Sequence, residues 1–323
     1  MPELTYRDAI RETLREALSS DDRVFLMGED IGAYGGAYGV THGLMEEFGE
    51  NRVKDSPIAE LVLVGAGIGS AMGGLRPVVE LMTINFSLLA ADQIVNVAAK
   101  LSYMSGGQVS VPLIVRTVTG GGSQLAATHS QSLEGWYAQV PGLKVVAPAT
   151  PYDARGLLRT AFEDLNPVIF VEHSLLYGSK GEVPDEPYSI PFGSADIKKS
   201  GADVSIITYL RMVPVALQAA AELAEEGIDA EVIDLRTLRP LDRDTVLESV
   251  KKTHRAVVVE EGWKTGGFGA EIASSIVEGA FDDLDAPIAR VAGEEVPMPY
   301  NRDLERAAIP GPANVVEAVK SLF

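Results

Sequence analysis

The sequence predicts an α/β protein of two domains, each built on a mostly parallel sheet with helices on both faces. The chain has 323 residues, which is longer than a single hydrophobic core usually supports. Short apolar runs of strand length alternate with longer segments of helical periodicity, a pattern typical of parallel sheets covered on both sides. A stretch rich in proline and glycine separates two such series, which predicts two domains.

The first series begins with a helix and continues as alternating strands and helices. Ile10, Leu14 and Leu18 recur at helical spacing behind Thr5, a suitable N-cap, so residues 6–18 are expected to form an amphipathic helix. The expected strands are Val24–Met27, Pro77–Leu81, Val111–Val115, Lys144–Ala147 and Val168–Val171, and the main expected helices are Leu88–Met104 and Tyr152–Asp164.

The periodicity is lost between residues 175 and 200, where prolines and glycines accumulate. We therefore place the first domain at residues 1–185, a linker at 186–200 and the second domain at 201–323. The second domain is also expected to be α/β and parallel. Its expected strands are Val204–Tyr209, Ala230–Asp234, Ala256–Glu260 and Ile288–Val291, and its expected helices are Val213–Glu226, Asp242–Lys252 and Ala270–Glu278.

The charge and composition exclude several classes of protein. With 27 basic and 46 acidic residues the formal net charge is −19, which repels nucleic-acid backbones and anionic lipid. The longest nearly uncharged stretch, Leu61–Leu75, is shorter than the roughly 20 apolar residues that span a bilayer. The start of the chain does not look like a secretory signal, and there are no cysteines. We therefore expect a cytoplasmic protein that binds neither nucleic acid nor membrane.

The run Leu61–Gly69 looks superficially like a dinucleotide-binding turn, because an apolar segment leads into glycines. The fingerprint requires a third glycine at a fixed spacing, and Ser70 or Met72 stands there instead. Glycines recur at every fourth residue from Gly65 to Gly73, so a helix with one closely packing face, for instance against another subunit, explains the run better. A nicotinamide oxidoreductase is therefore disfavoured.

Glu60 stands directly before this apolar helix, among apolar neighbours. One interpretation is a carboxylate that stabilises the N-terminus of the helix. The other is a partly desolvated carboxyl group, which exchanges a proton more readily and can share it with a heterocyclic nitrogen.

His129 lies in a glycine-rich loop, residues 119–131, that follows an expected strand. The carboxyl end of a parallel strand usually opens into a binding crevice, which favours a functional role. The alternative is a histidine that only organises its loop through hydrogen bonds. No second histidine or carboxylate stands at metal-ligand spacing, so a zinc site is not expected.

Nine further segments occur in a definite order along the chain. They are Met27–Asp30, Tyr34–Tyr38, Asp55–Glu60, Glu80–Phe86, Ala98–Gly107, His129–Ser132, Pro141–Val146, Arg236–Pro240 and Val296–Tyr300. In sequence, order and spacing they resemble the β subunits of thiamine-diphosphate-dependent 2-oxo-acid dehydrogenases. That family includes pyruvate, branched-chain 2-oxo-acid and acetoin dehydrogenases. The resemblance implies a pyrimidine-binding domain followed by a transketolase C-terminal-like domain.

The resemblance also implies a reaction and site residues. The reaction is oxidative decarboxylation of a 2-oxo acid, with transfer of the acyl group to the lipoyl group of a partner acyltransferase. Glu60 corresponds to the glutamate that hydrogen-bonds the cofactor's aminopyrimidine and promotes deprotonation of the thiazolium carbon. Phe86 matches the aromatic residue that packs on this ring, Leu61 and Tyr103 line the same region, and Glu29 matches a carboxylate near it.

Two further assignments follow from the same resemblance. His129 matches the histidine that assists acyl transfer to the lipoyl group. Members of the family also bind a structural potassium ion, mostly through backbone carbonyls, and the corresponding residues are Leu113, Ala161, Phe162, Asp164 and Asn166.

Half of the cofactor site is missing from this chain. Thiamine enzymes bind the diphosphate and its magnesium ion through a Gly-Asp-Gly segment, which does not occur here. In the family the segment lies on an α subunit, and the cofactor lies across the interface of an α₂β₂ heterotetramer. The resemblance therefore implies an α partner that supplies the magnesium ligands.

The substrate and some competing functions stay open from the residues. The segment His129–Trp136 is more similar to pyruvate or acetoin enzymes, whereas Ser56 and Leu89 depart from the usual pyruvate pattern. We favour pyruvate, with acetoin and branched-chain 2-oxo acids as alternatives. A self-sufficient thiamine transferase is disfavoured because the chain has no Gly-Asp-Gly segment. A non-catalytic binding subunit of the same fold is the remaining alternative.

Overall fold

The computed structural model describes residues 2–323. They form two compact units, and the chain passes between them more than once. Unit 1 extends to residue 119 and resumes at 136–192, whereas unit 2 comprises residues 120–135 and 193–323. The glycine-rich loop that carries His129 therefore belongs to unit 2. The predicted linker, residues 186–200, includes the point where unit 2 resumes, and its limits stay a prediction.

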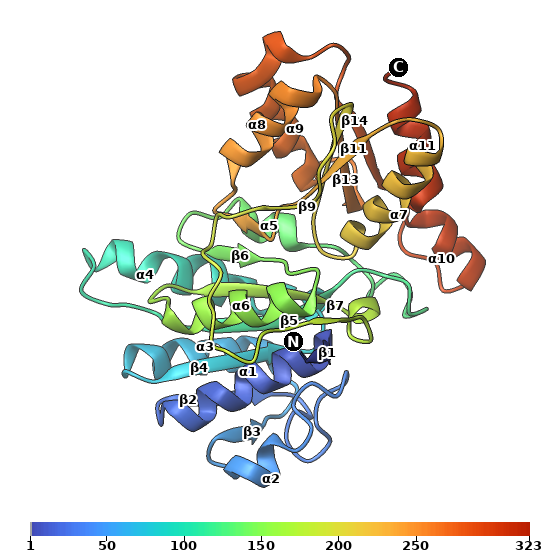
Figure 1. The fold of residues 1–323 in the computed structure, drawn as a ribbon. Coiled ribbons are helices and arrows are strands. Elements are labelled where there is room, and N and C mark those ends of the chain that lie inside the picture. Colours follow the sequence, from blue (N-terminus) through green and yellow to red (C-terminus); the bar gives the residue numbers. More distant parts are fainter. Residues whose placement is uncertain (1) are drawn as a thin grey trace. The chain divides into compact units, whose positions relative to one another are not determined.

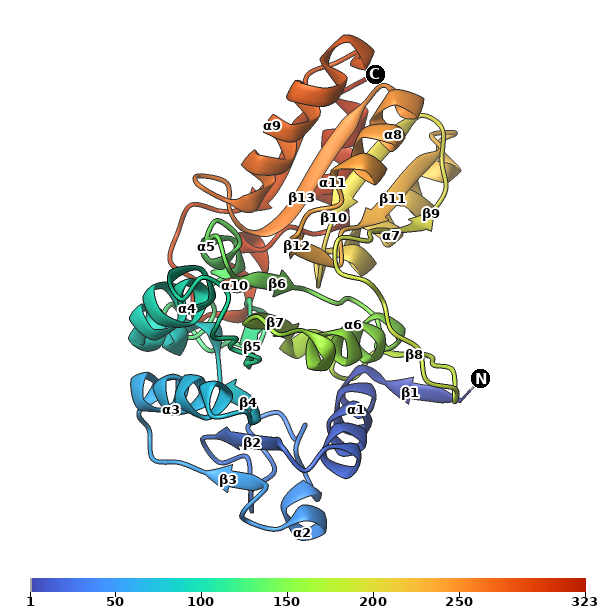
Figure 2. The same cartoon turned by 90° about the vertical axis from the view of Figure 1, so that its left-hand side faces the viewer.

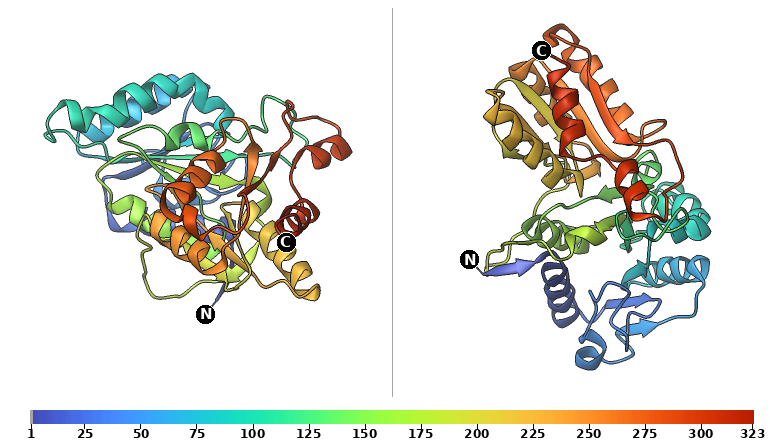
Figure 3. Two further views of the ribbon diagram at one scale, coloured as in Figure 1. Left: turned by 90° about the horizontal axis from the view of Figure 1, so that it is seen from above. Right: turned by 90° about the vertical axis from the view of Figure 1, so that its right-hand side faces the viewer.

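Unit 1 contains a parallel sheet whose strands follow the order β6-β7-β5-β4-β2-β3. Figure 2 shows α1 and α6 on one side of this sheet and α3 and α4 on the other. Its strands are β2 (Val24–Gly28), β3 (Val53–Asp55), β4 (Arg76–Leu81), β5 (Ile114–Thr119), β6 (Lys144–Val146) and β7 (Val168–His173). A separate antiparallel pair joins β1 (Glu3–Thr5) to β8 (Lys180–Glu182), as Figure 3 shows beside the N-terminus.

The helices of unit 1 follow from apolar periodicity and local capping. In α1 the hydroxyl of Thr5 accepts the N–H of Asp8 at 3.1 Å, and the apolar face is buried, as predicted. The helical segments of unit 1 are α1 (Tyr6–Ser20), α2 (Leu44–Phe48), α3 (Glu60–Met72), the 3₁₀ helix η1 (Ile84–Ala90), the π-helix η2 (Gln93–Ala98), α4 (Ala99–Met104), α5 (Glu134–Ala138), α6 (Pro151–Glu163) and the 3₁₀ helix η3 (Ser174–Leu176).

Unit 2 contains a sheet of order β14-β13-β10-β11-β9, in which only β9 is antiparallel. Figure 1 shows α8 and α9 on one side of it and α7 and α11 on the other. Its elements are β9 (Asp196–Lys199), β10 (Val204–Thr208), α7 (Met212–Glu225), β11 (Ala230–Asp234), β12 (Thr237–Arg239), α8 (Arg243–Thr253), β13 (Ala256–Trp263), α9 (Phe268–Ala280), η4 (Phe281–Asp283), β14 (Ala289–Gly293), α10 (Arg302–Ala308) and α11 (Pro312–Lys320).

The predicted fold class is confirmed, and three local predictions were wrong. Strand β5 begins at Ile114 rather than Val111, because Pro112 has no N–H to donate to the sheet. The segment expected as one helix from Leu88 to Met104 is divided into 3₁₀, π and α pieces. Strand β9 forms within residues 186–200, where no strand was expected.

The glycine run forms helix α3, as predicted, and not a dinucleotide-binding turn. The close approach inside the chain occurs at Gly67, where a Cβ would lie 2.7 Å from Val79 Cγ2. At Gly69 no described atom lies within 4 Å of the position that a Cβ would take. On the same face a Cβ at Gly65 would lie 3.3 Å from Gln93 Oε1, so the face is open at Gly69 only in part of its length. Its packing against another subunit stays a prediction.

Candidate cofactor site

The candidate site begins at the carboxyl ends of neighbouring parallel strands in unit 1. The register places Gly28 of β2 opposite Asp55 of β3 and Glu80 of β4. Glu29 follows β2 directly and is buried. Because the carboxyl ends of parallel strands meet at one edge of a sheet, this edge is a suitable place for a bound ligand.

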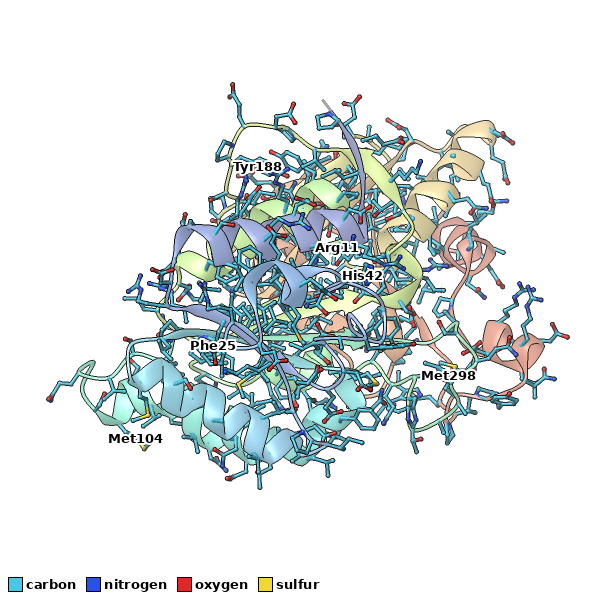
Figure 4. All side chains as sticks on the ribbon, turned by 90° about the horizontal axis from the view of Figure 1, so that it is seen from below. Arg11, Phe25, His42, Met104, Tyr188 and Met298 are labelled. Atoms are coloured by element: carbon cyan, nitrogen blue, oxygen red, sulfur yellow. The ribbon has the colours of Figure 1, made fainter. Side chains whose placement is uncertain are left out.

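Hydrogen bonds fix the loop that follows Glu29. The carboxylate of Asp55 accepts the N–H of Gly32 at 2.6 Å, and the hydroxyl of Thr41 donates to the carbonyl of Ile31 at 2.7 Å. Arg11 of α1 donates to the Val40 carbonyl at 3.0 Å. Figure 4 labels Arg11 of α1 and His42 of the loop. These hydrogen bonds tie the loop after Glu29 to β3 and to α1.

Glu60 is the first residue of α3 and is 96% buried, with a relative exposure of 4%. The residue before it, Ala59, has no side chain that could cap the helix, and its N–H donates to the carboxylate of Glu29. A carboxylate in the first turn is favoured by the helix dipole. The position of Glu60 thus agrees with both interpretations of the residue, the structural and the functional one.

Glu29 and Glu60 interact electrostatically. Burial raises the pKa of Glu29, the negative charge of Glu60 raises it further, and the hydrogen bond from Ala59 opposes both effects. Glu29 Oε1 is buried and has no hydrogen-bond partner among residues 2–323. A buried acceptor without a donor is unfavourable, so this oxygen is suited to a donor group on a bound molecule.

The apolar candidates lie on separate elements. Leu61 is half exposed on α3, and Phe86 is half buried on η1, which contacts α3. Tyr103 is 89% exposed on α4 and borders a hollow of about 270 Å³ whose lining includes Gly142 and Asn166. Tyr103 therefore lines the same hollow as Asn166, a residue expected to bind potassium.

The residues expected to bind potassium lie around the end of α6. They are Ala161, Phe162, Asp164 and Asn166. The fifth residue, Leu113, lies beside the start of β7, where its carbonyl accepts the N–H of Val168 at 2.9 Å. Carbonyl groups at a helix C-terminus carry partial negative charge, so this region fits a monovalent cation. Two side-chain cations already use it: Arg76 donates to the Phe162 carbonyl at 2.5 Å, and the ammonium of Lys144 contacts Asp164. A potassium ion would share these oxygens.

His129 is exposed on the glycine-rich loop of unit 2. Its Nδ1 lies 2.9 Å from the Thr128 hydroxyl, and its N–H donates to the Ala126 carbonyl at 3.2 Å. The position on a loop after a parallel strand agrees with the sequence prediction.

Two carboxylates that were not predicted from the sequence contact this loop. Glu261 accepts the N–H of Gly121 at 2.7 Å, and Glu305 accepts the N–H of Gly122 at 3.0 Å. Glu261 is 140 residues away from Gly121 in the chain, and Glu305 is 183 residues away from Gly122. Nothing in the sequence around Glu305 marks it as a partner of this loop, because the contact joins residues far apart in the chain.

Within residues 2–323, no group of three or more histidine, cysteine, aspartate or glutamate residues is arranged to hold a metal ion. No helix in this part of the chain is both long and apolar enough to cross a membrane.

The fold and the site together define a protein of the transketolase class. The family described as "Transketolase, pyrimidine binding domain" matches residues 2–180, and "Transketolase, C-terminal domain" matches residues 193–315. A solved structure described as "Split gene transketolase, inactive beta4 tetramer" has a TM-score of 0.80 and 23% identity, covering 99% of this chain and 98% of that one. This last likeness concerns the fold alone.

Sequence relatives narrow the class. The protein "Pyruvate dehydrogenase E1 component subunit beta" of Rickettsia felis is 51% identical over 99% of this chain and 98% of its own length. The mitochondrial "subunit beta-1" of Arabidopsis thaliana is 51% identical over 98% of this chain and 89% of its own. The protein of Rhizobium meliloti is 50% identical over 100% of this chain and 70% of its own. The chain belongs to the family of pyruvate dehydrogenase E1 component β subunits, and the resemblance found in the sequence is confirmed.

Proposed function

We propose that the chain is the catalytic β subunit of a thiamine-diphosphate-dependent pyruvate dehydrogenase that works only with an α subunit. The reaction is oxidative decarboxylation of pyruvate with acetyl transfer to the lipoyl group of a partner acyltransferase. The observation that carries the proposal is the buried pair Glu29 and Glu60 at the carboxyl edge of the pyrimidine-binding unit, with Glu29 Oε1 lacking a hydrogen-bond donor.

Thiamine diphosphate, when bound, supplies a carbon nucleophile for the 2-oxo group and accepts the electrons released by decarboxylation. The residues of this chain have a simpler task, which is to hold and move a proton at the aminopyrimidine. Glu60 is the proposed proton-exchanging carboxyl group, because it is buried and fixed at the start of α3. Glu29 provides an acceptor for a ring-side donor at its Oε1.

The apolar residues would exclude water from this region. Phe86 and Leu61 lie on contacting elements beside Glu60, and we propose that they pack against the aminopyrimidine together with Tyr103. A drier surrounding strengthens the electrostatic interaction between the two carboxyl groups and the bound ring. The exposure of Tyr103 would then be lost when a partner covers α4.

His129 is the proposed acid for the second half-reaction. Acyl transfer to a lipoyl group requires protonation of the sulfur that leaves, and a histidine can supply this proton near neutral pH. The exposure of the residue on its loop suits a group that must reach a carrier domain from outside.

An α subunit is proposed to complete the site in an α₂β₂ heterotetramer. The chain has no Gly-Asp-Gly segment for the diphosphate and magnesium. Large apolar side chains on and near α3 and η1 are exposed: Ile58 by 81%, Val62 by 66% and Leu89 by 62%. Exposed apolar groups gathered on neighbouring elements are typical of a surface that another subunit covers.

Potassium is proposed as a structural ion at the end of α6. The supporting observation is the cluster of carbonyl groups at Ala161 and Phe162 beside the carboxylate of Asp164. Replacing potassium by sodium should lower the thermal midpoint of the heterotetramer if the ion is bound there. The predicted cytoplasmic location stays a prediction.

The test is reconstitution of the chain with an α subunit that contains Gly-Asp-Gly. Calorimetry should detect magnesium-dependent binding of thiamine diphosphate to the heterotetramer and none to the isolated chain. Assays with an artificial electron acceptor should then show a higher kcat/KM for pyruvate than for acetoin or branched-chain 2-oxo acids. Tight binding by the isolated chain would contradict the divided site, and a fully assembled but inactive complex would favour a non-catalytic binding subunit.

A further inference from the structure

The glycine-rich loop of unit 2, residues 120–131, contains backbone conformations that residues with a side chain rarely adopt. Gly120 and Gly122 have φ values of +84° and +96°, and the non-glycine residues Gln124 and Ala126 have +56° and +65°. Such left-handed conformations are unfavourable for residues with a Cβ and persist only where the surroundings hold them. The base of the loop is closed by the Gly120 N–H, which donates to the Gln131 carbonyl at 3.1 Å.

The carboxylate of Glu305 holds the top of this loop. Its Oε1 accepts the N–H groups of Gly122 and Gln124, both at 3.0 Å, and its Oε2 lies 3.1 Å from the same Gln124 nitrogen. Glu305 belongs to α10 and is 1% exposed, whereas its neighbour Leu304 is 60% exposed. The helix therefore directs a charged side chain inward and leaves an apolar one outside, the reverse of the usual arrangement.

A second buried carboxylate contacts the loop one residue earlier. Glu261 of β13 accepts the Gly121 N–H at 2.7 Å. The space around Gly121 is full, since a Cβ there would lie 3.0 Å from Ile309 Cδ1 and 3.1 Å from Met298 Cε. Successive N–H groups that converge in this way form a site for an anion, and here the protein supplies the anions itself.

The anchored turn leads directly to His129. Ala126, two residues after the anchored Gln124, accepts the N–H of His129 at 3.2 Å, and the Thr128 hydroxyl contacts His129 Nδ1 at 2.9 Å. The imidazole is exposed and is carried by this loop, so the loop backbone sets the position from which the ring projects. A change in the turn at 122–126 would therefore change where the ring points.

We propose that Glu305 is a positioning residue, assisted by Glu261, which holds the glycine-rich loop in its left-handed turn and thereby orients His129 for acyl transfer. This inference rests on the role proposed above for His129. Glu305 itself contacts only backbone N–H groups of the loop among the interactions described, so its effect on the reaction is indirect.

The test uses Glu305→Gln in the α₂β₂ enzyme. Glutamine keeps the shape but loses the charge, and its NH₂ group faces N–H donors where a carboxylate oxygen stood. We expect lipoyl acylation to slow by about 10–10²-fold, a typical effect of a small misplacement, while decarboxylation with an artificial acceptor changes less than about twofold. Amide hydrogen exchange at Gly122 and Gln124 should become faster.

Glu317→Gln serves as the matched control, since Glu317 is an exposed glutamate on neighbouring α11. It should leave both assays and the loop amides unchanged. A double substitution, Glu305→Gln with His129→Ala, should acylate the lipoyl group no more slowly than His129→Ala alone, because Glu305 is proposed to act through the histidine.

The outcomes separate the two hypotheses. Equal losses in both assays, or a further full loss in the His129→Ala background, would overturn the positioning role of Glu305. Normal acylation by His129→Ala would instead contradict the proposed function of His129. In that case, unchanged amide hydrogen exchange at Gly122 and Gln124 in Glu305→Gln would also overturn the role of Glu305 in holding the loop. Faster amide exchange together with slower acylation would support that role.

Discussion

Arg116 and Glu172 form a bidentate ion pair in the interior of unit 1. The guanidinium Nε lies 2.7 Å from Oε1 and Nη2 lies 2.9 Å from Oε2, with both residues almost completely buried. Nη1 of the same arginine lies 2.6 Å from Glu80, and the Tyr177 hydroxyl donates to Glu172 at 2.8 Å. One cation on β5 thus compensates two buried carboxylates on β4 and β7, the strands on either side of it.

Arg116→Met should destabilise the chain by about 3–5 kcal/mol, because Glu80 and Glu172 would be left buried without a cation. The midpoint of urea unfolding at pH 7 measures this effect. Burial raises the pKa of Glu80, and Arg116 opposes this effect, so in the variant the pKa of Glu80 should rise further above its unfolded value and the loss should shrink as pH falls. Arg23→Met, which removes an exposed pair with Asp21, is the control and should change the urea midpoint little, because solvent screens the pair. A loss at Arg116 no larger than at Arg23 would show that the network is not needed for stability.

Glu29→Gln should stabilise the isolated chain near neutral pH. Burial, together with the charge of Glu60, raises the pKa of Glu29 in the folded state. In the unfolded chain Glu29 loses its proton at a lower pH than in the folded chain. Its contribution to folding stability therefore becomes unfavourable as pH rises above about 4.3. The gain in the urea midpoint should therefore disappear toward pH 4. Glu50→Gln, at an exposed position, should show no such pH dependence; a gain that is equal at all pH values would contradict the electrostatic explanation.

Glu60→Gln should slow activation of the bound cofactor by about 10²–10⁴-fold, since glutamine keeps a hydrogen bond but cannot exchange a carboxyl proton. Exchange of the thiazolium proton for deuterium in the heterotetramer measures this step. A residue that only stabilises the helix N-terminus would instead cost about 0.3–1 kcal/mol of stability. Proton exchange at the wild-type rate would leave Glu60 with that structural role alone.

His129→Ala should separate the two half-reactions. Acylation of a lipoylated domain should fall by about 10²–10⁴-fold, whereas decarboxylation with an artificial electron acceptor should fall much less. A histidine that only organises its loop would weaken both assays together, or lower stability by about 1–3 kcal/mol. His254→Ala, which removes an exposed imidazole on unit 2, provides the comparison for a histidine without a proposed role.

The order of strands and helices could be predicted because it depends on local patterns. Apolar periodicity over residues 6–18 predicted α1, and the spacing of Ile10 and Leu14 predicted its buried face. Glu60 could be selected because it stands directly before an apolar helix. The pattern of apolar residues does not show which N–H groups can bond in a sheet, so the start of β5 beside Pro112 was predicted wrongly. It also does not distinguish types of helix, so the π-helix η2 was not predicted.

The sequence by itself determined the fold class, the two-domain organisation, the family and Glu60 as the carboxyl group to examine, since each depends on neighbouring residues or on ordered motifs. Only the tertiary structure decided which distant groups meet. It brought Glu29 close enough to Glu60 for their charges to interact. It also brought the Glu305 carboxylate to backbone N–H groups that are 181 and 183 residues away in the chain. Such pairs depend on strand register and on the path of the loops within each unit, and a carboxylate in the sequence carries no mark of the backbone N–H group that it will meet.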